Sequence, residues 1–176
     1  MMMPPYHGTG LRADEAVICE HFAEVAESIS IPIMVQDAPL SGVTLSVDFL
    51  AQLATALPQV GYFKIEMPNT ADKIRSLIAT TRGVVVGPFD GEEGITLLAD
   101  LDAGATGTMP SALIPDLIKP VLEHHVIGDR EKAEVEYAQI LPVINFENRQ
   151  CGLRATKAAM KAGGVIKSDA VRHPLR

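Results

Sequence analysis

Residues 60–66 read Val-Gly-Tyr-Phe-Lys-Ile-Glu, and this stretch decides the fold. Apart from its lysine it is apolar through residue 65, which is typical of a strand buried on both faces in a parallel sheet. Comparable runs of apolar or small residues predict further strands at 31–35, 83–86 and 105–109, with a stub at 1–3. Amphipathic stretches predict helices at 14–29, 47–57, 70–79, 92–103, 114–127, 129–145 and 148–162.

Strands that alternate with helices indicate an α/β fold with a parallel sheet and right-handed crossovers. A doubly wound open sheet usually has a glycine-rich phosphate loop after its first strand, and this sequence has none. A (β/α) barrel gathers its chemistry at the C-terminal ends of the strands, where polar residues cluster in this chain. Because a complete barrel has eight strands, the pattern predicts a partial TIM (β/α)8 barrel over residues 1–128. Residues 129–176 are expected to form a C-terminal helical extension, and the whole looks truncated at both ends.

Composition and charge narrow the function classes. The 176 residues are 47% hydrophobic and 21% charged, an ordinary balance for a globular protein. A net charge of -7 argues against nucleic acid or an anionic membrane as a partner, because both need a basic surface. No apolar run approaches the roughly 18 residues of a membrane-spanning helix, so we expect a cytoplasmic protein. A small anionic substrate stays compatible, because a single lysine can dominate the charge of a pocket.

Lys64 is the sharpest candidate for chemistry. It ends a predicted buried strand, where the loss of water disfavours the charged ammonium. The neutral amine is the form that attacks a ketone to give an iminium, or Schiff base. The alternative is a strand-end lysine that extends its ammonium to solvent, and spacing alone leaves both interpretations open.

Other polar residues at the strand ends are candidates for the same site. Glu66 lies two positions beyond Lys64, so strand periodicity puts both side chains on one side. Its carboxylate could move a proton to or from a substrate carbon, or it could simply pair with the lysine. Asp37 could bind substrate or start the Asp-Ala-Pro turn. The complete set of candidate substrate-binding residues is Tyr6, His7, Gln36, Asp37, Glu92 and Thr108.

With these residues in view, the chain resembles the dihydrodipicolinate synthase / N-acetylneuraminate lyase family of class I Schiff-base enzymes. The resemblance runs from Pro4 to about Pro174. Residues 61–66 (GYFKIE) resemble the family's sixth strand, which carries the Schiff-base lysine at the position of Lys64. The other matching segments are 4–7 (PPYH, end of strand four), 31–39 (IPIMVQDAP, strand five), 87–93 (GPFDGEE, strand seven), 104–109 (GATGTM, strand eight) and 130–164 (C-terminal helices).

The resemblance implies the C-terminal half of the barrel, from strand four or five to strand eight, and an imine of Lys64 with a 2-keto acid, without metal or other cofactor. The family's proton-shuttle tyrosine matches Gln36, which cannot act as an acid or base near neutral pH. One branch of the family is more similar to this chain, on the segments 36–39 (QDAP), 63–66 (FKIE), 87–93 (GPFDGEE) and 147–150 (ENRQ). That branch dehydrates a 2-keto-3-deoxy acid to 2-oxoglutarate semialdehyde in L-arabinose catabolism, and Glu66 then becomes the expected proton carrier. The resemblance also implies a homo-oligomer, a tetramer with Tyr6 near a subunit contact.

Two other interpretations remain open. One is a dihydrodipicolinate synthase-like or pyruvate-dependent aldolase, and the other is a non-catalytic truncated chain or a half-barrel subunit that another chain completes. Relatives carry a longer stretch before Pro4, which includes the Gly-Thr-Thr or Gly-Thr-Ser motif for the substrate carboxylate. Because an open half barrel exposes strand edges and its apolar interior, we expect this chain to be inactive alone. We expect it to be stable only with a partner or within a longer product.

Overall fold

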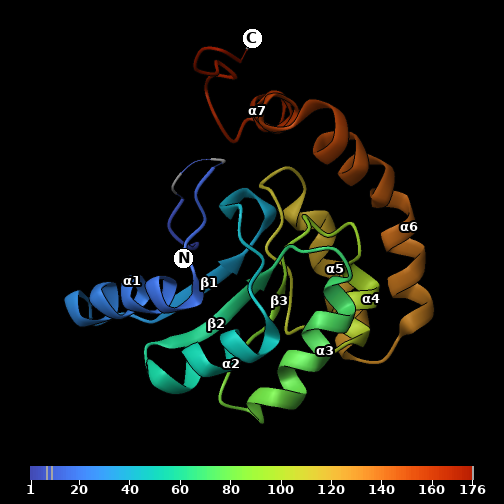
Figure 1. Cartoon of the computed structure of the whole chain (residues 1–176). Coiled ribbons are helices and arrows are strands. Elements are labelled where there is room, and N and C mark those ends of the chain that lie inside the picture. Colours follow the sequence, from blue (N-terminus) through green and yellow to red (C-terminus); the bar gives the residue numbers. More distant parts are fainter. Residues whose placement is uncertain (7, 9, 176) are drawn as a thin grey trace. The chain divides into compact units, whose positions relative to one another are not determined.

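A parallel sheet organises the first part of the chain (Figure 1). The computed structural model describes residues 1–6, 8 and 10–175, and within them the sheet has three strands, in chain order. They are β1 (Ile33–Asp37), β2 (Val60–Ile65) and β3 (Phe89–Asp90). Parallel bridges place Met2 beside Val35 and Thr108 beside Asp90, so the ladder continues past both outer strands. Neighbouring strands that follow chain order are the arrangement of a (β/α) barrel segment.

Helices connect the strands and pack on one face of the sheet. The helical elements of this first unit are α1 (Glu15–Ser28), a 3-10 turn (Pro39–Ser41), α2 (Val47–Ala56), α3 (Thr70–Thr81) and α4 (Leu97–Asp102). The N–H of Val17 donates to Asp14 Oδ1 at 2.9 Å, and the N–H of Phe49 donates to Ser46 Oγ at 3.1 Å. These side chains replace missing backbone acceptors at the helix starts, so Asp14 and Ser46 are the N-caps of α1 and α2.

The alternation of side chains along the strands determines which residues face the hydrophobic core. Val35 and Phe63 are fully buried and belong to the cluster that α1, α2 and α3 cover. Because successive side chains of a strand point to opposite faces, Gln36 and Lys64 point to the other face. The strand register sets Gln36 directly beside Lys64. The fold therefore brings two polar side chains together on the face that these helices do not cover.

The predicted strand at 83–86 is wrong. Gly83 has a left-handed φ of 87° where α3 ends, and the side chains of Val84 and Val86 are 57% and 64% exposed. The run joins β2 through the N–H of Val86, which donates to the carbonyl of Gly61 at 2.9 Å. The strand forms instead at β3, where the chain pairs with the end of β2.

Two further boundaries differ from the expectation. The helix expected at 92–103 begins only at Leu97, because Glu93 and Gly94 have positive φ angles of 58° and 84° that no α-helix accommodates. The strand expected at 105–109 is a single bridge at Thr108. Its backbone still follows β3, since the N–H of Asp90 donates to the carbonyl of Gly107 at 3.0 Å.

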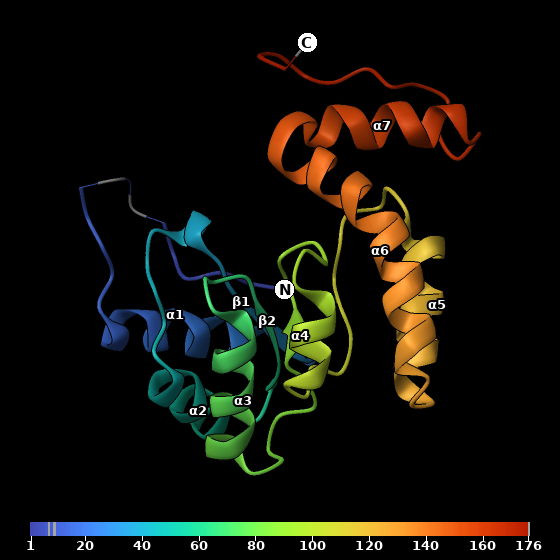
Figure 2. The ribbon, with the colours of Figure 1, turned by 90° about the vertical axis from the view of Figure 1, so that its right-hand side faces the viewer.

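The described chain divides into two units, and the helices after residue 109 form the second. The first unit comprises Met1–Glu92 and Thr96–Met109, and the second takes Glu93–Ile95 and the chain from Pro110. Its elements are α5 (Pro115–Val126), α6 (Arg130–Phe146), a π-helix (Glu147–Cys151) and α7 (Leu153–Ala162). Figure 2 shows α5 and α6 side by side. These helices are close to where the sequence predicted them, and α7 ends at Ala162, directly before the Gly163-Gly164 pair.

None of the helices in the described residues is both long and apolar enough to cross a membrane.

The compact units separate after Met109, so α5 groups with α6, whereas the predicted helical extension starts at residue 129.

Candidate active site

Lys64 and Glu66 form an ion pair at the C-terminal end of β2. The Nζ atom of Lys64 contacts Oε1 of Glu66, and the two side chains are 8% and 13% exposed. Both therefore sit where little water screens their charges. Burial of the lysine is the condition that the Schiff-base prediction requires, and the ion pair is the contact that the alternative interpretation of Glu66 expected. The pair brings a potential nucleophile and a potential proton acceptor into direct contact.

Gln36 from the neighbouring strand completes this cluster. Its Nε2 donates a hydrogen bond of 2.8 Å to Oε2 of Glu66, so the carboxylate uses one oxygen for Lys64 and the other for Gln36. A carboxylate only accepts hydrogen bonds, which fixes the amide nitrogen as the atom that faces it. Gln36 was expected to bind substrate, and in the structure it holds Glu66. The three residues are the part of the predicted site that the fold brings together.

Gly91 packs directly on this cluster, and the sequence analysis did not single it out. A Cβ added there would lie 2.4 Å from Cγ of Glu66, 2.9 Å from Cγ of Lys64 and 2.8 Å from the carbonyl oxygen of Ile65. Its own N–H donates to that carbonyl at 2.9 Å. The glycine directly after Asp90, in the family-like segment 87–93 (GPFDGEE), was the available signal, because glycine marks a close approach of the backbone.

Asp37 lies apart from the cluster, on the opposite face of β1. Its side chain is fully buried and forms an ion pair of 2.5 Å with Nζ of Lys73. Lys73 also donates to the carbonyl of Leu45 at 2.5 Å, and the N–H of Leu45 donates to Asp37 at 3.4 Å. These contacts tie β1 to α3 and to the segment before α2. The carboxylate of Asp37 thus forms contacts within the fold, and its expected role in substrate binding stays a prediction.

The remaining candidates occupy separate places. Tyr6 is 61% exposed and lines a hollow of about 430 Å³ with Arg12 and Leu40 among its neighbours. Thr108 donates to Asp90 at 2.5 Å, and the backbone N–H of Glu92 donates to the same aspartate at 3.1 Å. His7 lies outside the described residues. The roles expected for these residues stay predictions.

Two further carboxylates, Asp90 of β3 and Asp100 of α4, form a second acidic cluster. Both side chains are fully buried. Burial raises the pKa of Asp100 to about 7, against the hydrogen bond from Thr96, and the nearby charge of Asp90 raises it further. Burial likewise raises the pKa of Asp90, although the hydrogen bond from Thr108 opposes this. The sequence analysis did not predict this pair, because the local pattern around a helical aspartate does not indicate which residue of another element it packs against.

Comparison with known proteins places these residues in a family. The model of the Dihydrodipicolinate synthetase family matches residues 1–176. The chain belongs to this family. It is also 53% identical over 175 residues to the L-2-keto-3-deoxyarabonate dehydratase of Azospirillum brasilense, a match that covers 99% of this chain and 57% of that protein. The recognition of the family from its strand-end motifs is therefore confirmed.

More distant members show the same coverage. A 4-hydroxy-tetrahydrodipicolinate synthase of Corynebacterium diphtheriae is 28% identical over 172 residues, which are 96% of this chain and 54% of that protein. The crystal structure of the dihydrodipicolinate synthase from Rhodopseudomonas palustris superimposes with a TM-score of 0.88 at 26% identity, over 99% of this chain and 59% of that one. The chain thus spans a little more than half the length of its relatives and matches that share of their TIM barrel.

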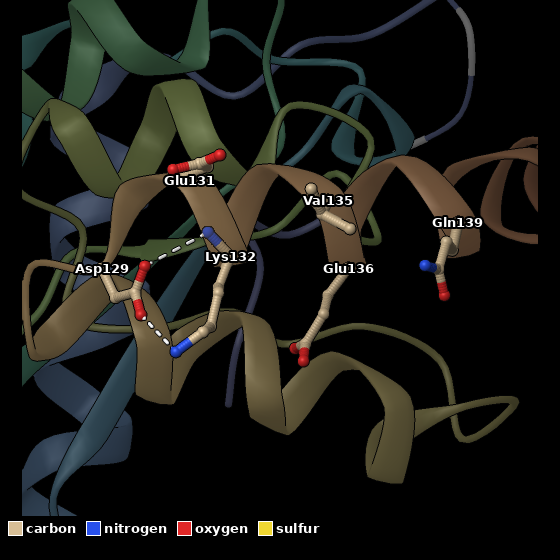
Figure 3. Close-up of a pocket in the computed structure, with 6 residues that line it drawn as sticks. All are labelled: Asp129, Glu131, Lys132, Val135, Glu136 and Gln139. Atoms are coloured by element: carbon tan, nitrogen blue, oxygen red, sulfur yellow. Dashed lines mark hydrogen bonds and ion pairs between the residues drawn. The ribbon is translucent and has the colours of Figure 1, made fainter.

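Another hollow of this family member lies along the start of α6 (Figure 3). It has a volume of about 500 Å³ and is lined by Asp129, Glu131, Lys132, Val135, Glu136 and Gln139. Nζ of Lys132 pairs with Oδ2 of Asp129 at 2.8 Å, and the N–H of Lys132 donates to Oδ1 at 3.3 Å, so these two groups satisfy one another. The hollow contains none of the candidate catalytic residues. Over the described residues, histidine, cysteine and acidic side chains form no group of three that could hold a metal ion.

Proposed function

We propose that the cluster of Lys64, Glu66 and Gln36 makes this chain a class I Schiff-base hydro-lyase. The proposed reaction converts a 2-keto-3-deoxy acid, L-2-keto-3-deoxyarabonate, to 2-oxoglutarate semialdehyde and water. One observation carries the proposal: a buried lysine in contact with a carboxylate that a glutamine holds in place. The 53% identity to an L-2-keto-3-deoxyarabonate dehydratase supports the choice of substrate.

The first step is imine formation on Lys64. Glu66 contacts the ammonium and can accept its proton, which leaves the neutral amine that attacks the C2 ketone. Loss of water from the resulting carbinolamine gives the iminium, and the proton on Glu66 can assist the departure of that hydroxyl. The positive iminium then acidifies the C3–H bond by drawing electrons toward C2. The reaction needs no metal or other cofactor, because the protonated imine supplies the electron sink.

The second step is elimination. Glu66, again a carboxylate, removes a C3 proton to give the enamine, and the enamine expels the C4 hydroxyl as water once that oxygen is protonated. Hydrolysis of the imine and tautomerisation release the semialdehyde, so the balance is one keto acid to one semialdehyde and one water. Glu66 is close enough to Lys64 to serve an atom one bond from the imine carbon.

Gln36 favours elimination over carbon–carbon cleavage. Cleavage between C3 and C4 requires a base that removes the proton of the C4 hydroxyl, whereas dehydration requires that hydroxyl to be protonated and leave. An amide is neither an acid nor a base near neutral pH, so a Gln36 in the place of the family's tyrosine supplies no base for cleavage. Gln36 acts here as a positioning residue that holds Glu66.

The placement of the chain within a barrel is part of the same proposal. Lys64 lies on β2, so β1, β2 and β3 correspond to strands five, six and seven of a complete barrel, and the bridges at Met2 and Thr108 mark strands four and eight. The chain is then the C-terminal half of a barrel over residues 1–128 with a helical extension over 129–176. A cytoplasmic location and a homotetramer, expected from the family, belong to this proposal as well.

The test is a product assay with L-2-keto-3-deoxyarabonate on the purified protein, fused to the part of the Azospirillum brasilense dehydratase that it does not match, because we expect the chain alone to be inactive. Release of 2-oxoglutarate semialdehyde supports the dehydratase, and release of pyruvate with an aldehyde contradicts it in favour of an aldolase. Glu66→Gln should keep a borohydride-trappable adduct on Lys64 but abolish turnover, because the amide keeps the contact and loses the base. Unchanged turnover in that variant rejects the role of Glu66. A protein that forms neither product nor adduct is a non-catalytic chain.

A further inference from the structure

Asp90 and Asp100 form a buried acid pair that the proposed chemistry does not use. Both side chains are fully buried, and within the described residues neither forms an ion pair with a lysine, arginine or histidine. The charges that reach the pair are the ammonium of Lys64, felt by Asp90, and the carboxylate of Glu92, felt by Asp100. Two buried carboxylates without a paired cation carry a high desolvation cost.

The hydrogen bonds of the described residues leave one buried oxygen of the pair without a donor. Asp90 accepts from the hydroxyl of Thr108 and from the N–H of Glu92, and Oδ2 of Asp100 accepts from the hydroxyl of Thr96 at 2.6 Å. Oδ1 of Asp100 is buried and has no hydrogen-bond donor among the described residues. Asp90 lies near enough for its charge to raise the pKa of Asp100. Because two neighbouring buried carboxylates are costly when both are ionised, a proton shared between them would lower this cost and give Oδ1 of Asp100 a partner.

The pair reaches the Lys64–Glu66 contact through a turn. Oδ1 of Asp90 accepts the N–H of Glu92 and so closes the backbone around Gly91. Gly91 in turn packs on the side-chain stems of Lys64 and Glu66 so closely that no Cβ fits. A shift of Asp90 would therefore move the surface against which the nucleophile and the proton carrier rest.

We propose that Asp100 is a positioning residue, which shares a proton with Asp90 and thereby fixes the Gly91 turn against Lys64 and Glu66. This inference rests on the proposed function for its effect on chemistry, but the shared proton is a property of the fold alone. Asp100 has no contact with the reacting atoms in this account and acts only through Asp90.

The first arm of the test follows the proton directly. In protein labelled with ¹³C at the aspartate side-chain carboxyls, spectra recorded against pH should show one signal that titrates near neutrality, and Asp100→Asn should remove it. This measurement needs no substrate, so it stands even if the chain forms no imine. If every aspartate carboxyl of the wild type titrates below pH 5, the shared proton is absent and the proposal is overturned.

The second arm follows positioning, with the rate at which pyruvate and borohydride modify Lys64. At pH 6 the modification rate of Asp100→Asn should equal that of the wild type, because the amide still donates a hydrogen bond to Asp90. As the pH rises and the pair loses its proton, the rate of the wild type should decline, whereas that of Asp100→Asn should not. Asp100→Leu offers Asp90 no donor and should slow modification by roughly ten- to a hundredfold, since small misplacements of reacting groups carry penalties of about that size. Asp72→Asn, an exposed acid on α3, is the matched control and should match the wild type.

Equal rates and pH profiles in the wild type, Asp100→Asn and Asp100→Leu would reject the positioning role. A wild type that gives the neutral titration but no adduct with pyruvate contradicts the proposed function and leaves the acid pair established. The two failures are therefore distinguishable.

Discussion

Gly91→Ala is the substitution for which the structure sets the clearest expectation. The new Cβ would meet Cγ of Glu66 at 2.4 Å, the carbonyl oxygen of Ile65 at 2.8 Å and Cγ of Lys64 at 2.9 Å. The backbone oxygen cannot retreat without loosening its 2.9 Å hydrogen bond to the N–H of Gly91, so the side chains of the ion pair must move as well. Overpacking of this kind costs about 1–3 kcal/mol, and we expect a loss of unfolding free energy in that range.

Urea denaturation measures this loss, and the rate of reductive pyruvate labelling of Lys64 measures the displacement of the site. The matched control is Gly61→Ala on β2, the strand of Lys64, where an added Cβ meets no atom within 4 Å and the backbone is not left-handed. That variant should stay within about 0.5 kcal/mol of the wild type and label at the same rate. If Gly91→Ala matches the wild type in both measurements, the close packing of the turn on Lys64 and Glu66 is refuted.

Three further expectations follow from the described contacts. Asp37→Asn leaves the ammonium of Lys73 buried beside a neutral group and should lower the unfolding free energy by about 3 kcal/mol in chemical denaturation; a loss no larger than that of the exposed control Asp72→Asn would contradict a buried pair. Ser46→Ala removes the cap of α2 and should cost about 1 kcal/mol by the same assay, with an unchanged value ruling out the cap. For Asp100, the folded pKa of about 7 lies above the ordinary 3.8, so the folded state keeps a proton that the unfolded chain releases between these values. Stability should therefore fall as pH rises through that window, by up to about 1.4 kcal/mol per pH unit; Asp100→Asn should flatten the slope, and an unaltered slope would disprove the assignment.

The strand-end cluster was predictable from the sequence because strand geometry is periodic. Lys64 and Glu66 are two residues apart on an apolar strand, so their shared side follows from the pleat alone. The family motifs singled out Lys64, among the lysines of the chain, as the expected nucleophile. The contact between Gln36 and Glu66, by contrast, depends on the register between two strands, and that register is set by packing across the whole sheet.

Other features depend on tertiary packing that local pattern cannot report. The apolar run at 83–86 reads as a strand, yet two of its valines are exposed and the chain pairs with β2 only at residues 89–90. Asp100 reads as a polar residue of a surface helix and is fully buried against Asp90. Gly91 reads as a turn glycine, and its reason for being a glycine is the side chains of another strand. In each case a neighbour distant in sequence decides the outcome.

The central claim is that Lys64 is the nucleophile, and reductive trapping with pyruvate tests it most directly. The purified wild-type protein is treated with pyruvate and borohydride, and peptide mass mapping locates the adduct. Lys73 is the internal control, since it is also largely buried but is held by Asp37 and Leu45. We predict a reduced pyruvyl adduct on Lys64 and none on Lys73, and the loss of the adduct in Lys64→Arg, which preserves the charge beside Glu66. An adduct that persists in Lys64→Arg, or an unmodified Lys64 in the wild type, would contradict this claim.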